Sequence, residues 1–424
     1  MFEMGLNCVK LLFAKTNRIP SQPHMQLTSR QVVTQFAHML QEELFPLLQS
    51  SVGPLNGQMQ LLASVISLAP LERMLCARRA ATGRPAKDRA ALATAFLAKA
   101  VLNLPTTRDL ICRLRVDEAL RRFCGWSSIQ ALPHESKFSR AFAEFAETEL
   151  PQQLHEAVIA TTQNQRLIGH IARDSTAIPA RERFPETKQQ RKQKKQKNKA
   201  KQRAAKQCKR TCSQGAYAKA KVAQSGTRIQ RQHHQKLAGM LSELPRQCDI
   251  GAKKNSHGNL QYWRGYKLHL DVADGQVPIS AVLTSASVHD SQVAIPLMTL
   301  SSQRVVHLYE LMDSAYDADA IHAHSRQLNH VPIIAPHGRR GTTRPSQLPK
   351  VFPDRPTPQL SWAQQDRYKE RTMSERVNAR LKDEFGASHL RVRGAAKVMA
   401  HLMFGVLALT VDQWMRMGIT DKKT

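Results

Sequence analysis

Apolar and polar residues recur with the period of an amphipathic helix in residues 368–382. This stretch contains no Gly or Pro and is rich in strong helix formers. At about 100° per residue, one narrow face collects four polar side chains: Tyr368, Arg371, Glu375 and Lys382. The opposite face collects three apolar ones: Met373, Val377 and Leu381. The pattern predicts a helix that packs on a core through one side and presents one carboxylate among a phenol and two cations on the other.

Two short, mostly apolar runs elsewhere in the chain each finish at an aspartate. Residues 167–174 end at Asp174, and residues 305–313 end at Asp313. Both have the length and composition of buried strands with an acid at the carboxyl end. The helix alone would be interpreted as a solvated surface helix with incidental charges. Two strand-end aspartates and Glu375, however, supply the oxygen ligands that hard divalent cations prefer.

The segments around these runs predict an α/β domain with a mixed sheet and flanking helices. A strand at 262–272 is followed by the hairpin signal Asp274-Gly275. The later elements follow in order: a strand at 277–285, a helix at 290–300, the strand ending at Asp313, a helix at 317–328 and a strand at 331–335. Residues 337–358 are rich in Arg, Gly and Pro, which predicts a loop. Three further acids here, Asp290, Asp317 and Asp319, are expected to be helix caps or surface charges.

Helical patterning dominates the first part of the chain. Residues 1–27 are expected to form a leader, because Pro20 and Pro23 interrupt any helix there. Residues 28–163 are predicted to form an all-helical domain with these helices: 27–48, 85–104, 107–123, 134–150 and one beginning at Pro151. Such a domain could be a helix-turn-helix that contacts a DNA groove through residues 136–140, or a plain bundle that mediates dimerisation.

The C-terminal end of the chain is expected to complete the domain that begins at residue 164. Residues 395–417 predict one long apolar helix. Lys397, His401, Asp412 and Arg416 interrupt its apolar surface, which favours packing in a core over a membrane span. Residues 418–424 are left as a tail.

The chain carries a formal charge of +30 and has a pI of about 10.3, which favours a polyanionic partner. Residues 188–210 contain twelve Lys or Arg, and no acid occurs between residues 187 and 242. This predicts a basic insertion, disordered or helical, at 186–250. It could simply keep the protein soluble, but counterion release favours a phosphate-binding arm. Four lysines are its candidate DNA contacts: Lys192, Lys194, Lys195 and Lys197.

Seven scattered cysteines, an odd number, indicate reduced thiols and a cytoplasmic protein. No stretch reaches the length of a membrane span, and the N-terminus lacks a clear signal-peptide cleavage site. Cys208 and Cys212 with His233 and His234 have only loose zinc spacing, so a structural zinc site is not expected.

With these residues identified, the chain resembles bacterial insertion-sequence transposases of the DDE type over residues 165–415. Tyr368, Arg371, Glu375 and Lys382 reproduce without a gap the spacing of a subgroup signature, Tyr-Arg-Glu-Lys (YREK). Residues 174–176 resemble the motif around the first Asp of that family, and residues 313–317 resemble the motif around the second. Residues 287–291 also resemble a common family stretch between the two motifs.

The resemblance implies a ribonuclease H-like catalytic domain at 164–417. It implies that Asp174, Asp313 and Glu375 are the catalytic metal ligands, for two Mg²⁺ ions that Mn²⁺ can replace. Its expected activity is to bind the ends of an insertion sequence, cleave DNA by metal-assisted hydrolysis and join the 3′ ends to target DNA by transesterification. The expected partners are double-stranded DNA and a second copy of the chain, with no membrane. The protein would be cytoplasmic and associated with the nucleoid.

The resemblance also gives roles to cations and aromatic residues. Arg371, Lys382 and Tyr368 would contact DNA near the cut. A hairpin intermediate with a flipped base would need an aromatic partner, for which Trp263 and Trp362 are candidates beside the simpler core or loop role. The alternative function is a DNA-binding protein of transposase ancestry that no longer cuts.

Overall fold

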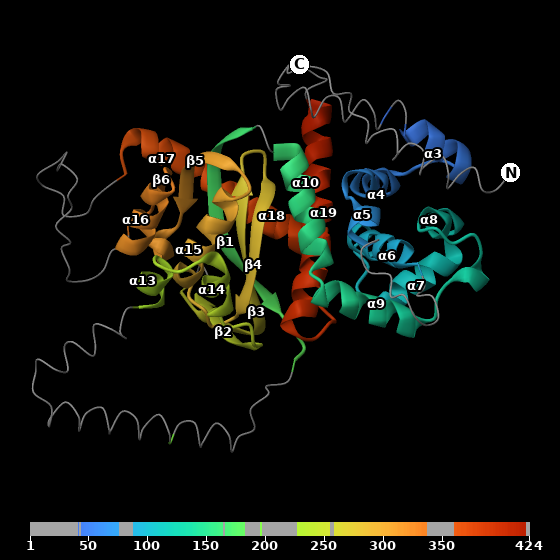
Figure 1. The fold of residues 1–424 in the computed structure, drawn as a ribbon, viewed down its shortest axis with the longest axis horizontal. Helices are drawn as coiled ribbons and strands as arrows, with labels where there is room; N and C mark the ends of the chain where they lie inside the picture. Colours follow the sequence, from blue (N-terminus) through green and yellow to red (C-terminus); the bar gives the residue numbers. More distant parts are fainter. Residues whose placement is uncertain are drawn as a thin grey trace, which may run out of the picture.

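The computed structural model describes residues 41, 44–75, 88–163, 166–182, 196, 227–254, 258–336 and 360–420. The predicted leader, most of the basic stretch at 188–210 and the predicted loop at 337–358 lie outside these residues. Figure 1 shows two parts on either side of one long helix, α19 (Ala395–Thr420). A sheet with its own helices lies on one side, and the N-terminal helices lie on the other.

The described N-terminal region is helical, as the sequence predicts. In chain order its helices are α3 (Phe45–Val52), α4 (Gly57–Leu68), α5 (Leu71–Leu75), α6 (Arg89–Val101), α7 (Thr107–Val116), α8 (Glu118–Phe123), η3 (Ile129–Ala131), α9 (Glu135–Glu147) and α10 (Leu150–Gln163). The single helix expected at 107–123 was wrong, because it divides at Asp117. That residue ends α7, and its side chain caps α8 by accepting a hydrogen bond from the Leu120 amide.

Helix α19 is a core element, as expected from its interrupted apolar surface. It is the one helix of the described chain that is long and apolar enough to cross a membrane by length and composition, which corrects the expectation that no stretch reaches that length. However, 72% of its apolar window is buried inside the protein. A single core cluster joins Phe96 and Phe142 of the N-terminal helices, Phe404 of α19 and Leu283 of the sheet. The ring centroids of Phe96 and Phe404 lie 6.1 Å apart. The helical region and the sheet therefore share one core through α19.

The sheet is mixed and has six strands: β1 (Leu167–Pro179), β2 (Asp249–Lys254), β3 (Leu260–Ala273), β4 (Val277–Ser285), β5 (Val306–Met312) and β6 (Val331–Ile334). Strand β3 pairs antiparallel with β1 and β4. On the other side of β1, strands β5 and β6 run parallel to it. The predicted hairpin turn is present, since Gly275 and Gln276 have φ angles of 81° and 61°. Four strands joined by antiparallel pairings, β1 to β4, are followed in the chain by the parallel strands β5 and β6. With its flanking helices, this mixed sheet fits the expected ribonuclease H-like architecture.

Strand β2 was not predicted, because its sequence lacks apolar alternation. It is an edge strand that pairs with the first part of β3, and its first residues fall in the range assigned to the basic insertion. Gly251 allows this pairing, since a Cβ there would lie 2.4 Å from the indole of Trp263. Trp263 Nε1 donates to the Tyr266 carbonyl at 3.1 Å, so this Trp has a structural role. Trp362, in contrast, is 89% exposed.

Three helices cover one face of the sheet. Helix α15 (Ser291–Ser302) packs on β3 and β4, and it is flanked by α13 (Arg228–Gln232) and α14 (Leu237–Ser242). The Gln232 amide donates to the Gln292 carbonyl at 2.9 Å, and Met240 packs against Ile295. The last part of the predicted insertion is therefore ordered. Helix α16 (Asp319–Gln327) lies between β5 and β6 in the chain, close to its predicted range.

Candidate active site

The two candidate aspartates lie on neighbouring parallel strands. Asp313 directly follows β5, as predicted, and its carboxylate accepts a hydrogen bond from the Ala315 amide at 3.0 Å. Asp174 does not end its strand, which corrects the expectation. Strand β1 continues to Pro179 because residues 175–179 keep pairing with β3. Ala172 of β1 is paired with Leu311 of β5, and extending this register by two residues brings Asp174 level with Asp313.

The electrostatics of this pair suit a bound cation. Burial, with the charge of Asp313 acting in the same direction, raises the pKa of Asp174 to about 6 against the lowering effect of Arg371. Burial also raises the pKa of Asp313, and Asp290 contributes in the same direction. Buried carboxylates that repel each other are stabilised as anions by a nearby positive charge. Since carboxylate oxygens are also the ligands that Mg²⁺ and Mn²⁺ prefer, these residues fit a divalent ion.

The signature segment is not one continuous helix, which corrects the prediction for residues 368–382. It consists of α17 (Trp362–Tyr368), the 3₁₀ turn η5 (Lys369–Arg371) and α18 (Thr372–Asp383). No residue here is a helix breaker, and the turn lies where the segment contacts β1 and β5. The tertiary contacts therefore account for the tighter turn.

The two predicted faces of the segment are nevertheless present. The three apolar residues are buried: Met373, Val377 and Leu381. On the other face, Arg371 Nη2 lies 2.5 Å from Glu375 Oε1, and the Arg371 guanidinium lies 5.7 Å from the centre of the Tyr368 ring. Glu375 is about half exposed, so its charge is balanced by Arg371 and by solvent.

Asn378 is a site residue that the sequence patterns do not reveal. It is buried on α18, and its Nδ2 donates to Asp174 Oδ2 at 3.1 Å. It lies three residues after Glu375, so one side of α18 carries both a candidate ligand and the amide that holds another. A search restricted to acids and cations could not detect this neutral side chain.

Asp290 was expected to be a helix cap or a surface charge, and its side chain does not cap α15. It occupies the N-cap position without a capping hydrogen bond. Instead it accepts from Lys267 Nζ at 3.0 Å and lies 3.8 Å from His269 Nδ1. Burial alone would raise the pKa of Asp290, but His269 and Lys267 together lower it below its ordinary value. The Asp290 carboxylate therefore binds Lys267 of β3 and does not accept a capping hydrogen bond at the start of α15.

Basic side chains surround Asp174. Burial and the charge of Lys253 lower the pKa of Lys382, while Asp174 acts in the opposite direction. Lys253 lies on β2 and also lowers the pKa of Asp174. It joins Arg371 and Lys382 as a third cation near the carboxylates, and it was not among the expected site residues because β2 was not predicted. The four lysines proposed for the basic arm lie outside the described residues: Lys192, Lys194, Lys195 and Lys197.

Two family models match the chain. Residues 225–411 match the Transposase DDE domain, and residues 49–144 match a Transposase domain (DUF772). No curated protein and no solved structure matches. Asp313 and Glu375 lie inside the first match, whereas Asp174 precedes it. The two matches support an insertion-sequence transposase of the DDE class, whose members normally use divalent metal ions and act on DNA.

Proposed function

We propose that the protein binds the ends of an insertion sequence, cleaves one strand at each end and joins the freed 3′ ends to target DNA. The alignment of Asp174 with Asp313 on parallel strands, with α18 held against Asp174 through Asn378, carries this proposal. Asp174, Asp313 and Glu375 would hold two Mg²⁺ ions, or Mn²⁺ in their place. Bound divalent ions would stabilise both the attacking and the leaving oxygen of the phosphodiester.

The side chains of the site have distinct tasks in this reaction. Burial and Asp313 disfavour the charged form of Asp174, so a bound cation would stabilise its carboxylate. Asn378 then keeps the Asp174 carboxylate oriented. Arg371 can exchange Glu375 for a DNA phosphate, to which its planar guanidinium can donate two parallel hydrogen bonds. Lys382 would add a positive charge near the same DNA strand, and the Tyr368 hydroxyl can donate a hydrogen bond to a phosphate oxygen.

The wider assembly follows from the same proposal. Double-stranded DNA supplies the transposon ends and the target, and two copies of the chain would hold the two ends. The basic stretch at 188–210 would contact phosphates without reading sequence. Such a protein works in the cytoplasm, associated with the nucleoid through DNA and with no membrane.

Cleavage of labelled transposon-end DNA tests the proposal. The substrate is taken from matched inverted repeats that flank the gene, and the reaction contains the full chain and Mg²⁺. We expect Asp174→Ala, Asp313→Ala and Glu375→Ala each to lower cleavage at least about a hundredfold, since even groups behind metal ligands contribute about 10–100-fold. DNA binding by gel shift should persist. Glu370→Ala is the matched control, because Glu370 is an exposed acid on the same segment.

The alternative function, a DNA-binding protein that does not cut, makes the opposite prediction. The wild-type chain would then bind end DNA, and no cleavage product would appear with Mg²⁺ or Mn²⁺. If an alanine variant of Asp174, Asp313 or Glu375 cuts as well as the wild type, the replaced residue is not part of the catalytic site.

A further inference from the structure

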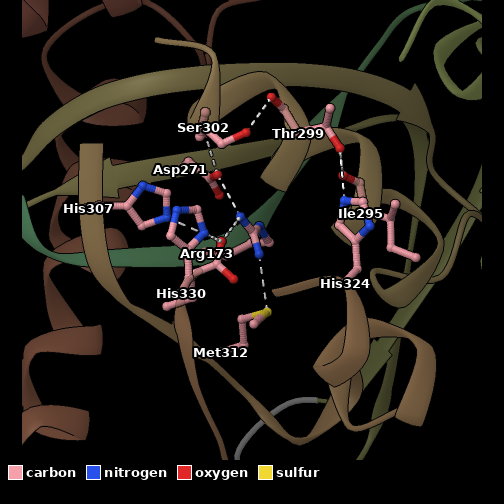
Figure 2. A network of polar contacts seen from close by, with 11 residues as sticks. Arg173, Asp271, Ile295, Thr299, Ser302, His307, Met312, His324 and His330 are labelled. Atoms are coloured by element: carbon pink, nitrogen blue, oxygen red, sulfur yellow. Dashed lines mark hydrogen bonds and ion pairs between the residues drawn. The ribbon is translucent and has the colours of Figure 1, made fainter. Parts of the chain in front are cut away.

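A buried ionic network surrounds Arg173, the residue before Asp174 on β1, and Figure 2 shows it from close by. At its centre is Arg173, which is 1% exposed. Its Nη2 lies 2.7 Å from Asp271 Oδ2 on β3 and 3.4 Å from Glu310 Oε1 on β5, and both acids are fully buried. Its Nη1 lies 3.2 Å from the sulfur of Met312. One guanidinium thus joins three neighbouring strands of the sheet.

The network is placed directly behind the candidate active site. Arg173 immediately precedes Asp174, and Met312 immediately precedes Asp313. Successive side chains of a strand point to opposite faces, so Arg173 anchors the back of β1 where its front carries Asp174. On the same back face, Ser301 Oγ of α15 donates to Asp271 Oδ2 at 2.6 Å. Any slip of β1 against β5 would therefore change the network and the separation of the two aspartates together.

Two histidines complete the network around Glu310. His307 Nε2 and His330 Nδ1 lie 3.4 and 3.7 Å from Glu310 Oε1, and their ring centroids are 3.6 Å apart. The ligand atoms of these three residues all lie within 4.8 Å of one another, so a zinc-type ion is an alternative occupant.

A count of charges favours a closed polar network over a metal site. Arg173 faces two buried carboxylates, Asp271 and Glu310, which leaves one surplus negative charge. His307 Nε2, 3.4 Å from Glu310 Oε1, can donate a hydrogen bond that helps to stabilise this charge. A divalent ion would instead leave a surplus positive charge beside Arg173, and buried charges that are not balanced are costly.

Burying such a network costs desolvation free energy, so it contributes little net stability to the fold. Buried ion pairs often add nothing to stability compared with apolar packing. Here, among the described residues, Asp271 Oδ1, Glu310 Oε2 and Arg173 Nε have no hydrogen-bond partner, which adds to the cost. Buried ionic groups can instead contribute specificity, because their directional bonds favour one register of the strands over others.

We propose that Arg173, Asp271 and Glu310 are positioning residues that hold β1 and β5 in the register required for Asp174 and Asp313 to share a metal site. This inference rests on the proposed function. It predicts that weakening the interaction between β1 and β5 lowers the affinity for the metal ion while the protein remains folded. Glu310→Gln removes the surplus charge without changing size, and Arg173→Lys keeps the charge but loses the fork that reaches both strands.

The test is a calorimetric titration of the full-length protein with Mn²⁺, accompanied by thermal melting. We expect both variants to bind Mn²⁺ about tenfold more weakly, the lower end of the usual effect of groups that orient ligands. Thr410→Val is the matched control, because Thr410 of α19 is fully buried in a polar contact with His155 of α10 at 3.3 Å, and neither residue belongs to the network. It should lower the melting temperature and leave Mn²⁺ affinity within about twofold, as expected for the loss of one hydrogen bond.

The possible outcomes separate this inference from the proposed function. If Asp174→Asn abolishes Mn²⁺ binding but Glu310→Gln and Arg173→Lys bind as the wild type does, the network is only structural and the inference fails. If Asp174→Asn binds Mn²⁺ normally, the proposed metal site itself is wrong. Stoichiometric zinc in the purified protein that disappears in His330→Leu would overturn the network in favour of a metal centre. Weaker Mn²⁺ binding in both variants, with Thr410→Val unchanged, supports the inference.

Discussion

Asn378 Nδ2 donates a hydrogen bond to Asp174 Oδ2 across 3.1 Å, and this bond joins α18 to the central strand β1. The two residues are 204 positions apart in the chain. Because Glu375 lies one turn before Asn378, the same bond fixes where α18 presents that carboxylate. A neutral amide thus joins the helix that carries Glu375 to the strand that carries Asp174.

Replacing the amide tests its part in the site. Asn378→Leu keeps the approximate size and loses the bond, so we expect about 1–2 kcal/mol lower stability for a buried hydrogen bond. Cleavage should fall about tenfold, because Asp174 loses its orientation. Denaturant unfolding and end cleavage measure the two effects. Ser374→Ala is the control, since Ser374 is buried on the same helix but donates locally to the Arg371 carbonyl at 2.8 Å. Equal loss of cleavage in both variants would contradict this role.

The second prediction concerns the arginine of the signature. Arg371→Ala should lower end cleavage more than Arg371→Lys, because Lys keeps the charge but cannot form two parallel hydrogen bonds to a phosphate. Arg376→Ala is the control, since Arg376 is exposed on the other side of α18. Arg380 cannot serve as an inert control, because it pairs with Glu384 at 2.7 Å and Asp412 at 2.5 Å. If Arg376→Ala costs as much cleavage as Arg371→Ala, the segment acts through bulk charge alone.

The third prediction follows from the raised pKa of Asp174, which burial and Asp313 bring to about 6. A carboxyl whose folded pKa lies above its unfolded value contributes stability below about pH 4 and loses it as the pH rises through about 6. The pKa rises from 3.8 to about 6. At about 1.4 kcal/mol per pKa unit, ionisation of Asp174 costs the metal-free fold on the order of 3 kcal/mol at neutral pH. Asp174→Asn should therefore melt higher than the wild type at pH 7.5.

The comparison at two pH values gives this prediction its control. At pH 4 the wild-type carboxyl is already protonated, so the two melting temperatures should converge. Glu370→Gln, at an exposed acid, should match the wild type at both pH values. A metal-free Asp174→Asn variant that melts below the wild type at pH 7.5 would contradict the account. Mn²⁺ affinity of the wild type should also fall below about pH 6, because protons compete for Asp174.

The fourth prediction concerns the basic stretch. Deleting residues 188–210 removes twelve positive charges. Binding should weaken on all DNA sequences, and the fall of log affinity with log salt should become shallower by about 0.9 for each phosphate that the protein no longer neutralises. Salt titrations of binding to end DNA and to unrelated DNA measure both effects. An unchanged salt slope would indicate that the stretch does not bind phosphates.

The parts of this structure that the sequence predicts are those set by local patterns. The strand before Asp313, the hairpin at Gly275 and the two faces around Glu375 each follow from residues within about a dozen positions. The parts that it does not predict depend on partners distant in the chain. Strand β2 forms because β3 offers an edge, and Asn378 matters because α18 packs on β1.

The buried network behind the site shows the same limit. Arg173, Asp271 and Glu310 meet only because β3 and β5 pair with β1 in one particular register. In the sequence, each of these three residues is a charged side chain within a mostly apolar stretch. The local pattern does not indicate that the three charges meet. The break of the signature segment at η5 is likewise a tertiary effect, since no residue there disfavours an α-helix.

The most direct test of the central claim exchanges a proposed metal ligand for one of different softness. Asp313→Cys is assayed for end cleavage with Mg²⁺ and with Mn²⁺, beside the wild type and the control Asp317→Cys, whose acid interacts with His322 at 3.3 Å. Thiolate binds Mg²⁺ poorly and tolerates softer ions better. The account predicts that Asp313→Cys loses cleavage with Mg²⁺ and recovers part of it with Mn²⁺, while both other proteins cut with either ion. Equal activity of Asp313→Cys with both ions, or cleavage with Mg²⁺ at the wild-type rate, would contradict a metal-binding role for Asp313.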